Sequence, residues 1–246
     1  MLSKISNLFN TNKSKTDYYH VDIHSHLVPA IDDGSKSMQE SIDIIKEFKK
    51  LGFKKLITTP HIMQHRFPNT SKIILSGVTE VQNELVKQGI DIQLEVACEY
   101  YLDEHFMQLL EKRDILTFGD NYLLFELSYA MKPANLLALI YEIEVAGYQP
   151  ILAHPERYLY LHDNFTLYEQ LKERGVLFQV NLNSFSGYYS KAVQKTAMKI
   201  LENGWIDFIG SDTHKLSHLE HFSKNYKGKI IEKIFEKNSI RNNQLL

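Results

Sequence analysis

Histidine and carboxylate side chains recur at short spacings in this chain, beginning with Asp22-Ile-His-Ser-His26 and Asp32-Asp33-Gly34. In an extended strand, successive side chains point to opposite faces, so His24 and His26 point the same way. Two imidazoles on one face of a strand end can act as a pair of metal ligands, and the acidic pair downstream offers a harder oxygen ligand. A metal centre of this kind needs further ligands from elsewhere in the chain.

Seven short, mostly apolar segments have the character of buried strands: residues 19–23, 55–59, 92–97, 122–125, 149–153, 177–180 and 206–209. Helical patterns lie between them at residues 37–51, 71–88, 103–112, 133–146, 167–174 and 191–202, and a last helix is expected over 226–237. Such alternation predicts a parallel sheet, and at 246 residues a closed or nearly closed α/β barrel. An open doubly wound sheet is the alternative, but no glycine-rich phosphate loop follows the first segment.

Candidate ligands follow six of the seven expected strands, at their carboxyl ends, which in a barrel share one rim where active sites form. Imidazole and carboxylate without thiolate suit Mn, Fe or Zn at a hydrolytic centre. Nine candidates are too many for one ion, so two or three ions are expected. Spacing alone only weakly favours Asp33 over Asp32. The nine are His24, His26, Asp33, His61, Glu99, Glu126, His154, Asp212 and His214.

Three further residues are candidates for contact with a substrate. Arg157 lies three residues after His154, and its planar guanidinium matches phosphate oxygens; a salt bridge to a nearby acid is its alternative role. His65 and Arg66 share the loop of His61. The remaining histidines are expected to be structural or exposed: His20, His105, His162, His218 and His221.

The single cysteine, Cys98, does not have the surroundings of a catalytic thiolate. A cysteine-dependent phosphatase needs an arginine six residues on, where this chain has Glu104. The neighbouring Glu99 raises the pKa of the thiol and so opposes its reactivity. We interpret Cys98 as a packing residue, so that any phosphate chemistry must depend on metal.

Composition excludes several classes of protein. The chain is 43% hydrophobic and 24% charged, which suits a folded core, and its net charge of −2 indicates no nucleic-acid partner. No apolar run approaches the roughly 18 residues of a transmembrane helix, and one cysteine cannot form an internal disulfide, so we expect a cytoplasmic protein. Residues 1–17 are expected to be a flexible extension, with a short amphipathic docking helix as the alternative, and residues 18–246 a single domain.

Four motifs resemble those of the PHP (polymerase and histidinol phosphatase) superfamily, in particular its bacterial protein-tyrosine phosphatases of capsular and exopolysaccharide synthesis. The motifs are the segment from Asp22 to Gly34, Thr59-Pro-His61, Ala153-His-Pro-Glu-Arg157 and Ser211-Asp-Thr-His214. The resemblance covers about residues 19–240 and implies a distorted, TIM-like (β/α)7 barrel with three ions. Mn²⁺ is the expected ion, with Fe, Zn or Mg as alternatives.

The resemblance also implies a role for each candidate residue. One ion is expected on His24, His26, Glu99 and Asp212; a second on Glu99, Glu126 and His154; and a third on Asp33, His61 and His214. Arg157 is expected to grip the phosphate and to act in catalysis with Asp212 and His214.

The function implied is hydrolysis of phosphotyrosine on a protein, such as a bacterial tyrosine kinase that controls polysaccharide synthesis, and the phosphatase could form homo-oligomers. Two alternatives stay open: a small-molecule phosphatase such as histidinol phosphatase, and a non-catalytic metal-containing scaffold of an export complex.

Overall fold

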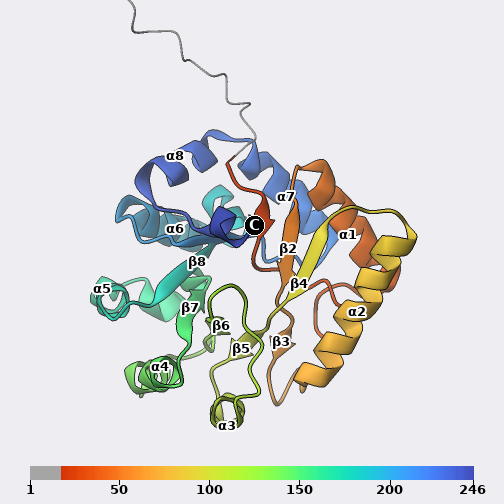
Figure 1. Ribbon diagram of the computed structural model, residues 1–246. Coiled ribbons are helices and arrows are strands. Elements are labelled where there is room, and N and C mark those ends of the chain that lie inside the picture. Colours follow the sequence, from red (N-terminus) through yellow and green to blue (C-terminus); the bar gives the residue numbers. More distant parts are fainter. Residues whose placement is uncertain (1–17) are drawn as a thin grey trace, which may run out of the picture.

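The computed structural model of this protein describes residues 18–246, in which parallel strands form two sheets surrounded by helices (Figure 1). The first sheet has the order β1-β2-β4 and the second β3-β5-β6-β7-β8-β9. The predicted α/β class is confirmed, since every strand pairing within the sheets is parallel. The strands are β1 (Val21–Asp22), β2 (Lys55–Thr58), β3 (His61–Ile62), β4 (Gln93–Val96), β5 (Glu99–Tyr101), β6 (Tyr122–Glu126), β7 (Gln149–Ala153), β8 (Leu177–Asn181) and β9 (Phe208–Gly210).

Two of the expected strands are each followed, after a short interruption, by a further short strand, so that the described residues contain nine strands where seven were predicted. The first interruption, between β2 and β3, contains Pro60, which has no N–H to donate to a ladder. The second interruption, between β4 and β5, lies beside the first, and Glu99 N donates to Pro60 O at 3.2 Å. The segments before the interruptions pair in the first sheet and those after them in the second.

The two sheets also meet at the carboxyl ends of β1 and β9. Ser25 and Thr213 form a parallel bridge, His26 N donates to Thr213 O at 2.9 Å, and Asp212 N donates to His24 O at 2.8 Å. These bonds place the segments that follow the first and last strands side by side.

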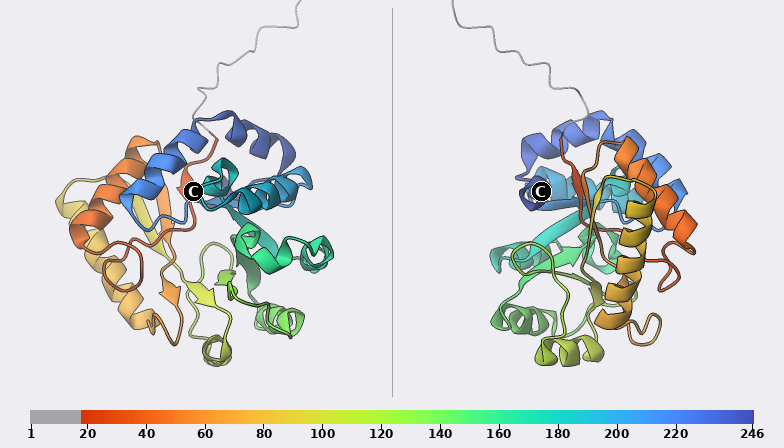
Figure 2. Two further views of the ribbon diagram at one scale, coloured as in Figure 1. Left: turned by 180° about the vertical axis from the view of Figure 1, so that it is seen from behind. Right: turned by 45° about the vertical axis from the view of Figure 1, so that its right-hand side comes forward.

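Eight α-helices lie around the outside of the strands within the described residues (Figures 1 and 2). They are α1 (Met38–Lys50), α2 (Ser71–Lys87), α3 (Glu104–Lys112), α4 (Leu136–Val145), α5 (Phe165–Glu173), α6 (Lys191–Glu202), α7 (Leu216–Tyr226) and α8 (Lys229–Lys237). Residues 18–246 also contain four short 3₁₀ turns: η1 (Pro155–Arg157), η2 (Leu159–Leu161), η3 (Leu182–Ser186) and η4 (Asn242–Leu245).

Local sequence signals explain several helix boundaries. Ser37 caps α1 by accepting a hydrogen bond from Glu40 N, and Ile42, Ile45 and Phe48 form its buried face. Asp103 caps α3 in the same way.

The sequence-based prediction was wrong for the last helices. A helix was expected to begin at Tyr226, but Tyr226 ends α7, and α8 begins after Gly228. The polar appearance of residues 216–225 hid the buried side chains Leu219 and Phe222. His218, one of the histidines expected to be structural or exposed, therefore lies partly buried on a helix.

The hydrophobic residues form two clusters. The larger one packs the helices against the strands. The smaller one takes alternate strand residues, such as Val21, Ile23, Ile57, Leu124 and Ile151, on the side of the strands that faces away from the helices. Within residues 18–246, no helix has the length and apolar character needed to cross a membrane. The extension predicted at residues 1–17 lies outside the described residues.

Candidate metal centre

All nine candidate ligands come together in one cluster of overlapping groups. They lie at the ends of, or just beyond, β1, β6, β7 and β9, at the start of the short strands β3 and β5, and in the loop before α1. Asp33 and His214 are partly buried, and the other seven are buried. Residues up to 190 positions apart in the chain thus share one site. The nine are His24, His26, Asp33, His61, Glu99, Glu126, His154, Asp212 and His214.

The carboxylate of Glu99 lies at the middle of the site. Its Oε1 is 2.8 Å from His154 Nε2. Its Oε2 is 3.1 Å from His24 Nε2, 3.3 Å from His61 Nδ1 and 3.4 Å from His26 Nε2. One carboxylate therefore faces four imidazoles, which is the arrangement expected of a ligand shared between ions.

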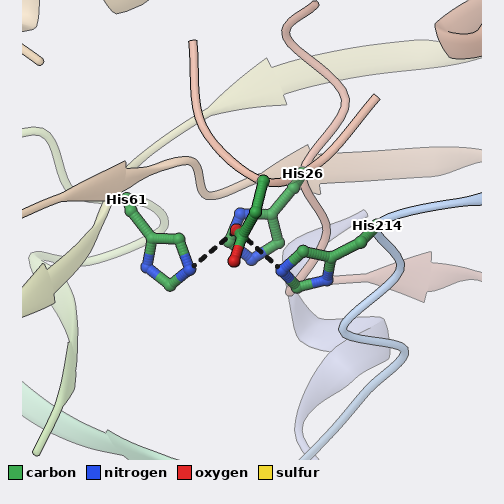
Figure 3. A group of neighbouring side chains, drawn as sticks. His26, His61 and His214 are labelled. Carbon is green, nitrogen blue, oxygen red and sulfur yellow. Dashed lines mark ion pairs between the residues drawn. The ribbon is translucent and has the colours of Figure 1, made fainter. Parts of the chain in front are cut away.

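A second group of ligand atoms surrounds Asp33. Figure 3 shows His26, His61 and His214 converging from three separate segments. Asp33 Oδ1 lies 3.5 Å from His61 Nε2 and 3.3 Å from His214 Nε2. The ligand atoms of these four residues all lie within 4.8 Å of one another, which is close enough for one ion to bind them.

Asp212 and Glu126 extend the cluster on its other sides. Asp212 Oδ1 is 3.5 Å from His24 Nε2, 3.6 Å from His26 Nε2 and 3.4 Å from His214 Nδ1. Glu126 Oε1 is 3.1 Å from His61 Nδ1. The candidate ligand groups are His26–Asp33–His61–His214, His24–Glu99–His154, His24–His26–Asp212 and His61–Glu99–Glu126. These groups overlap the three ligand sets that the resemblance implies. They differ in one respect: His154 is grouped with His24 and Glu99, whereas the resemblance groups it with Glu99 and Glu126.

The unsatisfied polar atoms of the site fit metal coordination. His26 Nε2, Asp33 Oδ1, His61 Nδ1 and Glu126 Oε1 are buried and make no well-formed hydrogen bond. Buried polar atoms are nearly always paired in folded proteins, because leaving them unpaired costs free energy. Four such atoms within one cluster of imidazoles and carboxylates are what a site that binds cations requires.

Residues that are not candidate ligands hold the imidazoles in place. His26 Nδ1 donates to Asp32 Oδ2 at 2.8 Å, and His24 Nδ1 donates to Gln179 Oε1 at 2.7 Å. Each bond leaves the Nε2 atom of the ring free to face the centre, which is how proteins orient ligand histidines. Asp32 thus orients His26, while its neighbour Asp33 faces the cluster.

Strand β8 carries no candidate ligand but supports ligands on both sides of it. Gln179 Nε2 donates to Asn181 Oδ1 at 2.8 Å, and Asn181 Nδ2 donates to Asp212 Oδ2 at 2.7 Å. A chain of hydrogen bonds therefore joins His24 to Asp212. Gly210 makes room for it, since a Cβ there would lie 2.4 Å from Gln179 Nε2.

Two candidate ligands have unusual backbone conformations. His154 has a φ of 34° and Asp212 a φ of 50°, both in the left-handed region. This region is costly for residues other than glycine and persists where the surrounding structure enforces it. Such strain is concentrated at functional sites.

The imidazoles keep the buried carboxylates ionised. Burial raises the pKa of Glu99, but the nearby His24 and His61 outweigh burial and hold that pKa well below its usual range. Burial likewise raises the pKa of Asp32, but His26 brings it down to about 2. The pKa of Asp212 is lowered by His24 and His214 in spite of its burial. At neutral pH these groups are anionic, which favours cation binding.

A cavity of about 350 Å³ opens above the cluster. Arg157 lines it and donates from Nη1 to Asp212 Oδ2 at 2.7 Å. The guanidinium lies between the rings of Tyr129 and Tyr189, 5.0 Å and 4.5 Å from their centroids. Its remaining N–H groups are donors available to an anion in the cavity.

The two other predicted substrate residues differ in position. Arg66 lines the cavity, and its Nη2 lies 3.4 Å from Asp33 Oδ2. His65 is exposed and is not among the residues that line the cavity. Cys98 is fully buried, and burial raises the pKa of its thiol well above the usual value, in agreement with a packing role.

Several residues of the site escaped the sequence analysis: Gln179, Asn181, Tyr129, Tyr189 and His218. A polar residue within an otherwise apolar strand was the available signal for Gln179. His218 lines the cavity because α7 begins beside the rim. No local pattern marks the two tyrosines.

Residues 20–243 match the profile of a protein family described as capsular polysaccharide synthesis, CpsB/CapC. The chain belongs to the CpsB/CapC family. The family therefore agrees with the resemblance inferred from the four motifs.

Relatives and a solved structure are similar over most of their length. The chain is 28% identical over 197 residues to the tyrosine-protein phosphatase YwqE of Bacillus subtilis, covering 80% of this chain and 78% of the relative. It is 29% identical over 202 residues to the tyrosine-protein phosphatase CpsB of Streptococcus pneumoniae, covering 80% and 83%.

The fold is also similar to a solved chain from the crystal structures of YwqE of Bacillus subtilis and CpsB of Streptococcus pneumoniae, two proteins described as metal-dependent tyrosine phosphatases. The match has a TM-score of 0.75 at 26% identity and covers 88% of this chain and 91% of the solved chain.

Proposed function

We propose that this member of the CpsB/CapC family is a metal-dependent phosphatase that hydrolyses phosphotyrosine on proteins. The observation that carries the proposal is the cluster of nine imidazole and carboxylate ligands beneath a cavity lined by Arg157. The relatives named tyrosine-protein phosphatases support the substrate class. We further propose that the substrate is a bacterial tyrosine kinase of polysaccharide synthesis, that both act in the cytoplasm, and that the phosphatase forms homo-oligomers.

We propose that the nine residues hold two or three ions. Mn²⁺ is the proposed ion, with Fe, Zn or Mg as alternatives, because the ligand set has imidazoles and carboxylates but no thiolate. When bound, such ions neutralise negative charge on phosphate and lower the pKa of water enough to supply a nucleophile at neutral pH.

The protein's own contribution is to position and neutralise the phosphate. Arg157 is held from one side by Asp212, so its other N–H groups can donate to oxygens of the transferring phosphoryl group without reorganisation. Asp212 Oδ2 makes this contact while Oδ1 faces the imidazoles, which couples the position of the guanidinium to that of the ligands.

The leaving group of the proposed substrate places modest demands on the site. The phenol of tyrosine has a pKa of about 10, well below that of an alkyl alcohol, so phenolate is the better leaving group. A strong general acid therefore matters less than it does for an alkyl phosphate.

The test compares hydrolysis of a phosphotyrosine peptide with that of histidinol phosphate, after chelation and after Mn²⁺ is restored, with the metal content measured in parallel. We expect Mn²⁺ to restore activity on the peptide together with two or three ions per chain. A strong preference for histidinol phosphate would favour a small-molecule phosphatase instead. Metal-loaded protein that hydrolyses no aryl phosphate would favour a scaffold.

A further inference from the structure

Tyr129 is a half-exposed aromatic residue on the wall of the cavity. It belongs to the loop between β6 and α4, and 47% of its surface is accessible. Its ring lies 5.9 Å from the ring of His154, nearly parallel to it, and 5.0 Å from the guanidinium carbon of Arg157. A large aromatic side chain is thus exposed beside the groups expected to bind phosphate.

The loop that carries Tyr129 is held on both sides of this residue. Leu127 N donates to the hydroxyl of Tyr158 at 2.9 Å, and the hydroxyl of Tyr160 donates to Ser128 O at 2.7 Å. Ala130 N donates to Ser128 Oγ at 3.1 Å. The ring of Tyr158 also packs against that of Tyr129 at 5.5 Å. The exposed ring is therefore placed before any ligand arrives, which lowers the entropic cost of binding.

Two other aromatic residues near the site, Tyr189 and Phe67, are already engaged, and a third, Tyr101, lines the cavity but is less exposed than Tyr129. The Tyr189 hydroxyl accepts from Asn181 Nδ2 at 3.1 Å and donates to Asp212 Oδ2 at 3.5 Å, while its ring contacts Arg157. The ring of Phe67 stacks on His61 and is covered by Arg66. Among the aromatic rings that line the cavity or adjoin it in the described residues, Tyr129 combines a fixed position with a large accessible surface.

We propose that Tyr129 contacts the aromatic ring of the substrate and selects aryl over alkyl phosphate monoesters. This inference rests on the proposed phosphatase function. The ligand cluster and Arg157 recognise the phosphate, which both substrate classes share, so they cannot distinguish one class from the other. Discrimination through binding, beyond that due to the lower pKa of the phenol, requires contact with the leaving group, and an aromatic side chain provides it through edge-to-face or offset contact.

The experiment measures the ratio of kcat/KM for a phosphotyrosine peptide to that for the matching phosphoserine peptide, using the Mn²⁺-loaded protein. We expect Tyr129→Leu to lower this ratio about 3- to 10-fold, the range for the loss of one aromatic pair. Tyr129→Phe keeps the ring and should keep the ratio, since the hydroxyl that it removes lies 3.5 Å from His154 Nδ1 and faces the metal centre common to both substrates. Tyr141→Leu is the matched control, because Tyr141 is 52% exposed on α4 and does not line the cavity.

Calorimetry provides a second readout that does not depend on turnover. We expect Tyr129→Leu to weaken binding of phenylphosphonate relative to methylphosphonate by a similar factor, and Tyr129→Met to act likewise if the leucine variant folds poorly. Equal losses for both ligands would overturn the proposal by reducing Tyr129 to a support for Arg157, and no loss for either would overturn it by showing that Tyr129 does not contribute to binding. Failure of the phosphatase function itself would appear separately, as wild-type protein that hydrolyses neither peptide.

Discussion

Glu99→Gln tests whether one carboxylate is shared between metal ions. The two oxygens of Glu99 lie between 2.8 and 3.4 Å from nitrogen atoms of four histidines, and the side chain is fully buried. Glutamine has nearly the same shape but offers one neutral oxygen. The substitution therefore removes a charged ligand with little change in packing.

The expected magnitude follows from the linkage between binding and stability. Loss of a residue that merely orients a ligand costs 10- to 100-fold in metal affinity, so loss of a shared ligand is expected to cost at least about 100-fold. A 100-fold loss of metal affinity corresponds to about 2.7 kcal/mol of metal-dependent stability for each affected ion. This holds when the Mn²⁺ concentration is well above the Kd of the wild type and that of the variant. For a chain of this length, Tm changes by about 2–4 °C per kcal/mol, so the rise in Tm caused by Mn²⁺ should be smaller in the variant than in the wild type by about 5–11 °C for each affected ion.

The assay is thermal unfolding of metal-free protein during titration with Mn²⁺, together with the number of ions bound per chain. Glu80→Gln is the control, because Glu80 is exposed on α2, away from the site, and this variant should behave as the wild type does. An unchanged number of ions and an unchanged Mn²⁺-dependent rise in Tm for Glu99→Gln would refute the shared-ligand assignment.

Three other substitutions test separate parts of the site. Arg157→Met should lower kcat by about 10²–10³-fold with the metal content retained, as for loss of one transition-state donor, whereas the distant Arg174→Met should have little effect; an unaffected kcat would exclude a role for Arg157. Gln179→Leu should weaken Mn²⁺ binding about 10- to 100-fold in a metal titration, because His24 loses the acceptor that orients it; unchanged affinity would contradict this. Cys98→Ala should keep phosphatase activity, and Cys98 in native protein should resist thiol reagents until unfolding; lost activity with intact metal content would contradict a packing role.

The order of strands and helices was largely predictable, since it depends on patterns that are local in the chain. Helix α6 has the predicted bounds, because Ser190 caps its beginning and an amphipathic pattern continues to Glu202. The prediction failed for α7, where the buried Leu219, Phe222 and Tyr226 have helical spacing but are the few buried positions in a segment dominated by polar residues. It also missed the interruptions after β2 and β4, which depend on how neighbouring strands pair.

Apart from the choice between Asp32 and Asp33, the candidate ligands could be selected from the sequence alone. Each candidate follows or ends a recognisable apolar segment, or lies in the loop after one, and parallel strands place their carboxyl ends together whatever the details of the fold. Residue type then restricts the chemistry to imidazole and carboxylate ligands. Neither the order of the segments nor the residue types depend on interatomic distances.

Only the tertiary structure decided how the ligands are held and what surrounds them. Asp32 and Asp33 are adjacent in sequence, yet one orients His26 and the other faces the cluster, because the loop turns their side chains in different directions. Gln179 reaches His24 from a strand 155 residues away, and Tyr129 meets Arg157 across a loop. Such contacts depend on strand register and loop conformation, which arise from the packing of the whole chain and leave no local pattern in the sequence.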